Sequence, residues 1–283
     1  MSCTRKKSHS SISTLLFHKD RIYAGGYEYD NVRHGNIEVY DKDLCLLMAA
    51  DTQGTLDIKI FDTFIYVSTS TSIIKYNLNL EKLFEYKTGY MNTFMVIYES
   101  FIYVCTAKGT IDVYTLSLNL LYSIKVSNDI LWTCAVQNNT IYCGGECGTL
   151  FCIKNKQIVY RIKFTQGITC ITIYTDCLLV GSYDEHIYKI KQDNIVNKYF
   201  IGGGIWRVKQ YKDLFFISCM YEGIKIINKK FDKILYQTTN NTVSMPEDIS
   251  KLVYALDTNE NSVIYATFYE KKISRWLIDD LLI

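Results

Sequence analysis

The chain has 283 residues, enough for one large all-β domain or two ordinary domains. Its 31 basic and 29 acidic side chains leave a formal net charge of +2, which gives no support to a nucleic-acid or membrane-surface role. No apolar run approaches the roughly 20 residues needed to span a bilayer, and the first residues lack the apolar stretch of a signal peptide. We therefore expect a cytoplasmic protein.

In chain order, residues 1–10 are predicted to form a flexible basic tail and residues 11–283 a single domain. Within that domain an apolar pair, a variable residue and two small residues recur, first as Ile22-Tyr-Ala-Gly-Gly. The copies begin at residues 22, 65, 102, 141, 178, 215 and 263, at steps of 43, 37, 39, 37, 37 and 48. Repeats of about 40 residues are typical of propeller blades.

Each copy belongs to a set of four predicted strands. An apolar stretch precedes the copy, an alternating segment follows it after a short turn, and a weaker fourth strand comes last, as in residues 157–163. The sequence therefore predicts an all-β, seven-bladed, WD-repeat-type β-propeller without helices. Residues 26–34 and 239–250 are predicted as longer loops. The last six residues are only a short candidate for the outer strand of the final blade. The alternating segments cover residues 35–41, 71–77, 109–115, 148–154, 185–191, 222–228 and 271–277.

WD repeats usually carry a Gly-His pair, a turn aspartate and a Trp-Asp end, joined by hydrogen bonds. Here the turn aspartate survives clearly only as Asp184, and the Trp-Asp position of the first blade reads Tyr40-Asp41. His186 lies beside Asp184 and Glu185, and a histidine beside carboxylates can act as a general base. A solvent-facing histidine and a purely structural aspartate are the alternatives, and both remain open.

Alignment of the blades places one residue of each innermost strand at an equivalent position, nine residues before the apolar pair. Three of the seven are aromatic. Either they pack along the propeller axis, or they form an aromatic cage with one acid, which suits a quaternary ammonium ligand. The aligned residues are Ser13, Leu56, Thr93, Trp132, Thr169, Trp206 and Tyr254, and the turn residues that follow the small pair add Ala107, Glu146, Tyr183, Met220 and Phe268.

The sequence lacks the motifs of a zinc site and of a serine esterase. The ten cysteines include no Cys-x-x-Cys pair and no defensible zinc spacing, so we interpret them as free structural thiols and expect no metal site. The sequence has no Gly-x-Ser-x-Gly, which excludes the usual serine-esterase elbow.

Two segments about 20 residues apart carry a family resemblance. They read Gly-Ser-Tyr-Asp-Glu-His-Ile from residue 181 and Gly-Gly-Gly-Ile-Trp-Arg-Val-Lys from residue 202. Together they resemble the diphthine methylesterases, also described as the WD-repeat diphthine methyltransferase family of diphthamide biosynthesis. The likeness covers roughly residues 130–277 and is faint before them. Weaker matches follow the same order at residues 131–133, 142–146, 219–225, 252–257 and 266–270.

The resemblance implies hydrolysis of the methyl ester of methylated diphthine on translation elongation factor 2. This reaction frees the carboxylate for the final amidation of diphthamide. The substrate carries a trimethylammonium group near the ester, so an aromatic-lined pocket makes physical sense. We expect elongation factor 2 as the protein partner, no cofactor, no nucleic acid, no membrane, and a monomer. Three departures are Glu146, where the family has Asp, Thr258, where it has Trp, and residues 165–167, which lack a histidine.

Roles are assigned from the predicted geometry, since no catalytic residue is carried over from the family. Glu146, Asp184 or His186 would activate water, and Arg207 or the backbone amides near Gly203 and Gly204 would stabilise the oxyanion. A non-catalytic WD-repeat scaffold mediating protein–protein interactions and a related propeller that has lost activity are the alternatives. The substrate-binding candidates are Trp132, Tyr183, Gly203, Gly204, Trp206 and Tyr254.

Overall fold

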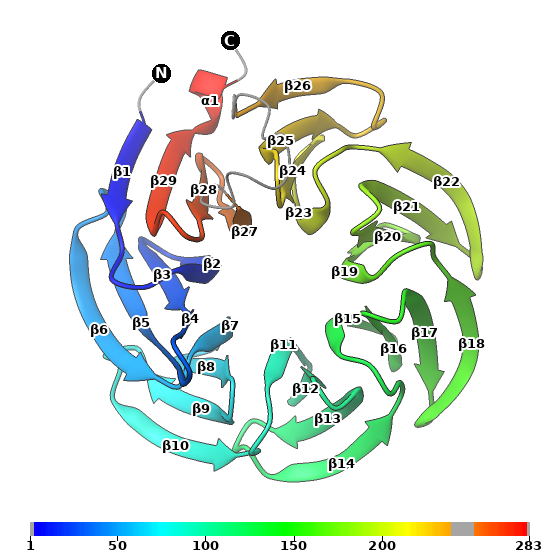
Figure 1. The fold of residues 1–283 in the computed structure, drawn as a ribbon, viewed down its shortest axis with the longest axis horizontal. Helices are drawn as coiled ribbons and strands as arrows, with labels where there is room; N and C mark the ends of the chain where they lie inside the picture. Colours follow the sequence, from blue (N-terminus) through cyan, green and yellow to red (C-terminus); the bar gives the residue numbers. More distant parts are fainter. Residues whose placement is uncertain (1–2, 239–251, 282–283) are drawn as a thin grey trace. The chain divides into compact units, whose positions relative to one another are not determined.

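The computed structural model describes residues 3–238 and 252–281. The predicted loop over residues 239–250 lies outside them. Within the described part, antiparallel four-stranded sheets follow one another along the chain, and each is one blade of a seven-bladed β-propeller (Figure 1). A four-residue helix, α1 (Ile278–Leu281), follows β29, so these residues are not the outer strand for which the last six residues were a candidate. The all-β, seven-bladed fold class is confirmed.

The blades keep the predicted order of four strands. Blade 1 contains β2 (Ile12–His18), β3 (Arg21–Gly26), β5 (Arg33–Asp41) and β6 (Leu46–Thr52), and blade 2 contains β7 (Thr55–Phe61), β8 (Phe64–Thr69), β9 (Ser72–Asn77) and β10 (Lys82–Lys87). Blade 3 contains β11 (Asn92–Tyr98), β12 (Phe101–Thr106), β13 (Thr110–Thr115) and β14 (Leu120–Lys125). Blade 4 contains β15 (Leu131–Gln137), β16 (Thr140–Gly145), β17 (Thr149–Lys154) and β18 (Gln157–Lys163).

Blades 5 to 7 follow the same pattern. Blade 5 contains β19 (Ile168–Tyr174), β20 (Cys177–Ser182), β21 (His186–Lys191) and β22 (Asn194–Phe200). Blade 6 contains β23 (Ile205–Tyr211), β24 (Leu214–Cys219), β25 (Gly223–Asn228) and β26 (Ile234–Gln237). Blade 7 contains β27 (Val253–Thr258), β28 (Ser262–Thr267), β29 (Lys272–Leu277) and β1 (Cys3–Lys7).

The predicted loop over residues 26–34 is partly a hairpin. The two-residue strand β4 (Glu28–Tyr29) pairs with the beginning of β5, in the register Glu28↔His34 and Tyr29↔Arg33. Sequence patterning gives no sign of β4 because so short a strand has no alternation to detect.

The chain packs as two compact units. Unit 1 comprises the described residues of Met1–Ile58 and Ile201–Ile283, and unit 2 comprises Lys59–Phe200. Inside each unit, apolar side chains of consecutive blades pack on one another. In unit 2, one cluster includes Val113 of blade 3 and Phe151 of blade 4, and in unit 1 another includes Tyr40 of blade 1 and Ile264 of blade 7. This packing explains why the second strand of a blade, such as β20, is buried along its whole length.

Blade 7 takes its outer strand from the beginning of the chain. β1 pairs antiparallel with β29, from Cys3↔Trp276 to Lys7↔Lys272, and Figure 1 shows the two strands side by side. The predicted flexible tail over residues 1–10 is therefore wrong for Cys3–Lys7. The segment gives no strand signal because four of its five side chains are exposed, so no apolar alternation marks it.

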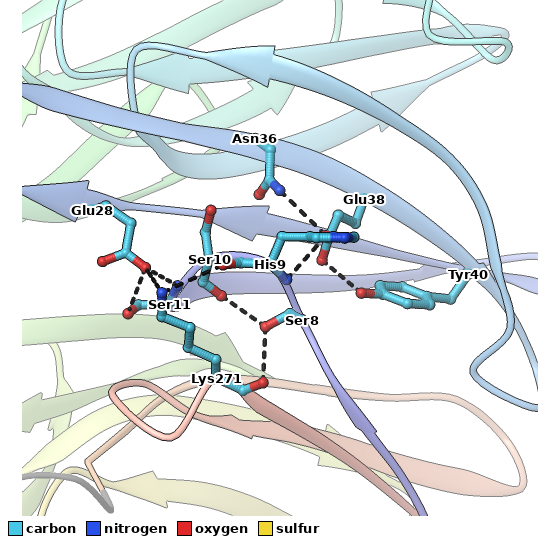
Figure 2. A network of polar contacts seen from close by, with 9 residues as sticks. All are labelled: Ser8, His9, Ser10, Ser11, Glu28, Asn36, Glu38, Tyr40 and Lys271. Atoms are coloured by element: carbon cyan, nitrogen blue, oxygen red, sulfur yellow. Dashed lines mark hydrogen bonds and ion pairs between the residues drawn. The ribbon is translucent and has the colours of Figure 1, made fainter.

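A polar network holds the chain between β1 and β2 (Figure 2). The Ser8 amide donates to the Lys271 carbonyl at 2.8 Å. The fully buried Glu38 carboxylate accepts a hydrogen bond from the His9 amide at 3.2 Å and one from the Tyr40 hydroxyl at 2.6 Å, and it also contacts the His9 imidazole. A buried charge requires such partners, so the network fixes where the chain passes from blade 7 into blade 1.

A second carboxylate completes this junction. Glu28 Oε1 lies 2.6 Å from Lys271 Nζ and accepts the Ser11 amide at 2.9 Å. Burial raises the pKa of Glu28, but the Lys271 ammonium and the Ser11 donors outweigh burial and leave that pKa below its usual range. The ionised carboxylate therefore ties the β28–β29 turn to blade 1.

Candidate functional site

The aligned residues of the innermost strands occupy a recurrent β-bulge. In blade 4 the pairing of the first and second strands skips from Leu131 to Thr133, and in blade 6 it skips from Ile205 to Arg207. A bulge removes one residue from the ladder and re-aims its side chain. Leu56 holds the same second position in β7. The residues skipped in the other six blades are Ser13, Thr93, Trp132, Thr169, Trp206 and Tyr254.

Hydroxyl side chains at this position bond to the backbone. Ser13 Oγ donates to the Gly25 carbonyl at 3.1 Å and to the Thr55 carbonyl at 2.5 Å. Thr93 and Thr169 likewise donate to carbonyls of their own second strands, each at 3.1 Å. Blades 4, 6 and 7 carry Trp132, Trp206 and Tyr254 at this position and blade 2 carries Leu56, so these four blades differ from the three with a hydroxyl side chain.

The turn residues named by the alignment lie next to these bulges. The Glu146 amide donates to the Ile130 carbonyl at 2.9 Å, and the Met220 amide donates to the Gly204 carbonyl at 2.8 Å. In each case the acceptor is the residue just before the first strand. The turn residue after the second strand therefore lies beside the bulge in the first strand of the same blade.

In unit 2 this geometry joins two predicted site residues. Trp132 Nε1 donates to Glu146 Oε2 at 2.8 Å. The indole fixes one carboxylate oxygen, which orients the group. Tyr183, a predicted cation-binding residue of blade 5, donates its amide to the Gly167 carbonyl at 3.0 Å.

Asp184 has the contacts of a structural turn residue. Its carboxylate accepts hydrogen bonds from the Thr165 hydroxyl, from the Tyr188 hydroxyl at 2.5 Å and from the His186 amide at 3.3 Å. Burial raises the pKa of Asp184, but these donors outweigh burial and lower the pKa below its usual value of 3.8. Thr165 and Tyr188 thus hold the Asp184 carboxylate in the turn between β20 and β21. A carboxylate held in this way is poorly placed to accept a proton from water.

His186 is partly buried beside this turn. Its Nδ1 lies 2.5 Å from the Asp184 carbonyl oxygen, a contact that requires the proton on Nδ1, and its ring packs edge-on against Phe200 at 5.3 Å. The Nε2 atom is then the acceptor nitrogen, as a general base requires.

In unit 1 the glycine triplet adopts a backbone that side chains disfavour. Gly202, Gly203 and Gly204 have φ values of +91°, +71° and +68°. A Cβ on Gly203 would lie 2.8 Å from Glu222 Cβ, closer than such atoms approach. The triplet therefore packs directly on Cys219, at the end of β24, and on Glu222 in the turn that follows.

A buried lysine secures this contact. Lys225 is 4% exposed, and its Nζ donates to the Ile201 carbonyl at 2.5 Å and to the Glu222 carboxylate. Sequence reasoning missed this pair. The available signal was a lysine between two isoleucines in a largely apolar strand, which indicates a buried ammonium with a specific partner.

An aromatic row runs from the triplet side of blade 6 into blade 7. The Trp206 and Tyr254 rings lie 4.8 Å apart, Tyr254 and Phe268 5.2 Å apart, and Phe268 and Tyr269 4.9 Å apart. Burial raises the pKa of Tyr254 to about 12, so its phenol stays neutral. The guanidinium of Arg207 lies 5.4 Å from the Trp206 ring centre, and Nη1 donates to the Trp206 carbonyl at 2.9 Å.

The predicted site residues thus form one group in each unit. Trp132, Glu146, Tyr183, Asp184 and His186 belong to unit 2, and Gly203, Gly204, Trp206, Arg207 and Tyr254 belong to unit 1.

Among residues 3–238 and 252–281, no set of three histidine, cysteine, aspartate or glutamate side chains is arranged to hold a metal ion. In the same part of the chain, no helix has the length and apolar character needed to cross a membrane. The ten cysteines are free thiols, and seven of them are buried.

Comparison with known proteins identifies the fold. The WD40 β-propeller domain of Doa1 superposes with a TM-score of 0.79 at 11% identity, over 96% of this chain and 94% of that one. The chain has a WD40-type β-propeller fold. The computationally designed protein Ika8 matches with a TM-score of 0.69 at 14% identity, over 96% of this chain and 98% of that one. No family model matches the sequence, and no curated protein is significantly similar to it. At these identities the likeness concerns the fold alone.

Proposed function

We propose that this protein is a cytoplasmic carboxylic ester hydrolase that removes the methyl ester of methylated diphthine from translation elongation factor 2. The aromatic row of Trp206, Tyr254 and Phe268, which begins two residues after the glycine triplet, carries the proposal. A trimethylammonium group has no proton to donate, so the π faces of rings, apolar contact and a nearby acid can hold it but hydrogen bonds cannot. Blades 1, 3 and 5 have serine or threonine at the equivalent position, so the rings are a feature of particular blades.

The proposed reaction also needs a group that accepts a proton and groups that stabilise the oxyanion. Hydrolysis adds water across the ester, releases methanol and leaves the diphthine carboxylate. Glu146, oriented by the Trp132 indole, is the group we assign to accept the proton of the attacking water. Arg207 and the backbone amides of Gly203 and Gly204 are assigned to the oxyanion.

The decisive experiment is intact mass spectrometry of elongation factor 2 carrying methylated diphthine, before and after incubation with the purified protein. We expect the loss of one methylene's mass, with no change on elongation factor 2 that already carries the free carboxylate. Glu146→Gln is expected to abolish the loss, whereas Glu81→Gln, an exposed turn carboxylate of blade 2, is the matched control.

The aromatic row has a separate readout. Trp206→Leu is expected to raise the KM of the reaction, and Trp206→Phe to restore much of the affinity because it keeps a π face. Equal KM values for Trp206→Leu and the wild type would contradict the cage. A folded wild-type protein that leaves the mass unchanged would overturn the esterase.

A non-catalytic scaffold is the second candidate. The observation in its favour is the carboxylate of Asp184, which three donors engage for a structural purpose. An unchanged mass together with a stable complex with elongation factor 2 would support the scaffold. An unchanged mass without a complex would support a related propeller that has lost both properties.

A further inference from the structure

A basic groove of about 700 Å³ lies in unit 1, where β1 meets the turn before β29. Its lining includes five cations and one acid, in a chain whose formal net charge is +2. The rest of the chain therefore carries a net negative charge, so the groove is a local concentration of positive potential. The charged lining residues are Arg5, Lys6, Lys7, Glu270, Lys271 and Lys272.

Most of these cations lack an internal counter-charge. Lys271 pairs with Glu28 at 2.6 Å. Among residues 3–238 and 252–281, no carboxylate forms an ion pair with Lys6, Lys7 or Lys272. Folding therefore gathers these charges without neutralising them.

The strand register makes this arrangement unfavourable on its own. Lys7 and Lys272 are direct cross-strand partners, and like charges directly opposite each other destabilise a sheet. Side chains alternate along a strand, so Arg5 lies on the same face as Lys7. Three cations therefore share one face at the end of the β1–β29 ladder, and an anion bound there would relieve their repulsion.

The groove also borders an open strand edge. β1 is the last strand of its sheet, with β29 as its neighbour in the described residues. An edge strand exposes backbone N–H and C=O groups that can pair with another chain. Lysine and arginine on such an edge discourage pairing with a second basic edge, but they favour an acidic one.

We propose that this groove binds an acidic, extended segment of a partner protein, which adds to β1 as a further strand. Backbone pairing would supply the ladder, and carboxylates at every second position would meet the row of Arg5, Lys7 and Lys272. A nucleic acid fits less well, because single-stranded binding uses several aromatic stacking surfaces and the lining offers only Tyr269. The inference is independent of the proposed esterase.

The test uses the whole protein and a fluorescent ten-residue peptide of alternating glutamate and threonine, with binding followed by anisotropy. We expect saturable binding that weakens as salt concentration rises. The double variant Lys7→Gln/Lys272→Gln is expected to weaken binding about tenfold. The control Arg161→Gln/Lys163→Gln removes two exposed charges from β18, the outer strand of blade 4, and is expected to leave binding unchanged.

Two further probes separate the possible binding modes. The same peptide with every second backbone nitrogen methylated keeps its charge but cannot form a ladder, and it is expected to bind several-fold more weakly. Equal binding of this peptide would overturn strand addition. An oligothymidylate of equal charge that binds more tightly, and that also depends on Lys7 and Lys272, would replace the acidic segment with a nucleic acid. No binding of the acidic peptide, or an equal loss in the control variant, would overturn the proposal.

Discussion

The indole of Trp132 donates to the carboxylate of Glu146, with 2.8 Å between Nε1 and Oε2. Trp132 occupies the β-bulge of the first strand of blade 4, and Glu146 is the first residue after the second strand. The bond therefore joins the two sets of residues that the blade alignment singles out. It gives Glu146 a fixed orientation that a freely rotating surface glutamate lacks.

Replacement of Trp132 by phenylalanine tests this positioning. Trp132→Phe keeps a ring but loses the donor, so we expect kcat of the proposed esterase to fall about tenfold at an unchanged KM. The bond is exposed, so the free energy of unfolding should change by less than about 1 kcal/mol. Steady-state kinetics and urea unfolding provide both readouts. A change in stability without a change in kcat would mean that the bond is merely structural.

The glycine triplet allows a matched comparison of alanine substitutions. Gly203 and Gly89 have similar φ values, +71° and +74°, but a Cβ at Gly203 meets Glu222 while one at Gly89 has no atom within 4 Å. We expect Gly89→Ala to cost about 1 kcal/mol of unfolding free energy from backbone strain. Gly203→Ala should cost about 3 kcal/mol because overpacking is added. Equal costs in urea unfolding would contradict the close packing of the triplet on Glu222.

The buried Glu38 carboxylate depends on its tyrosine donor. Tyr40→Phe removes the 2.6 Å bond in a position that water does not reach. We expect a loss of about 2 kcal/mol in unfolding free energy, as for a hydrogen bond to a charged group. Tyr29→Phe is the control, because Tyr29 is 65% exposed and its change should be less than about 0.5 kcal/mol. Similar unfolding midpoints for the two variants would rule out a stabilising role for the Tyr40–Glu38 bond.

The contacts of the Asp184 carboxylate predict that the free energy of unfolding depends on pH in the acid range. Its pKa is lower in the folded protein than the ordinary value of 3.8, because the Thr165 and Tyr188 donors outweigh burial. The ionised carboxylate therefore stabilises the fold above pH 3.8, and this contribution is lost as the pH falls through the lower folded-state pKa. Asp184→Asn should flatten the acid limb of a curve of unfolding free energy against pH, and the exposed Asp43→Asn should leave that limb unchanged. An acid limb in Asp184→Asn like that of the wild type would contradict the assignment.

Lys225 links the triplet to β25. Lys225→Met leaves the Ile201 carbonyl without its donor and Glu222 without its ammonium, and we expect a cost of about 2 kcal/mol in unfolding free energy. The cost is moderated because the Glu222 side chain is 44% exposed and can regain water. Lys229→Met, which breaks an exposed pair with Asp213, is expected to cost less than about 0.5 kcal/mol. A smaller effect at Lys225 than at Lys229 would be inconsistent with the buried contact.

The repeat period was sufficient to predict the blades, since the third strands begin within two residues of the predicted segments, as at Arg33 and Thr110. β1 was missed for a physical reason. Its pairing partner lies at the other end of the sequence, and its exposed basic side chains carry no periodicity. Hydrophobic periodicity reveals strands one at a time and does not show that two strands far apart in the sequence pair.

The candidate site also has a part that the repeat predicts and a part that it does not. Equivalent positions in a repeat can be aligned without a structure, which is why Trp206 and Tyr254 were paired by their spacing and do lie in ring contact. The Glu222–Lys225 pair and the buried Glu38 could not be found in this way. Their partners, Ile201 and His9, belong to connections between blades, whose path the sequence pattern does not determine.

The pairing of β1 with β29 joins two strands that are synthesised at different times. Cys3–Lys7 are made before the other described strands, and their partner strand, Lys272–Leu277, is made after them. β1 must therefore stay unpaired while all the strands between β1 and β29 are made. Blade 7 cannot be completed until Lys272–Leu277 have been made, so its closure is a long-range step of folding. The exposed lysines and arginine of the waiting segment would keep it hydrated and discourage aggregation until then.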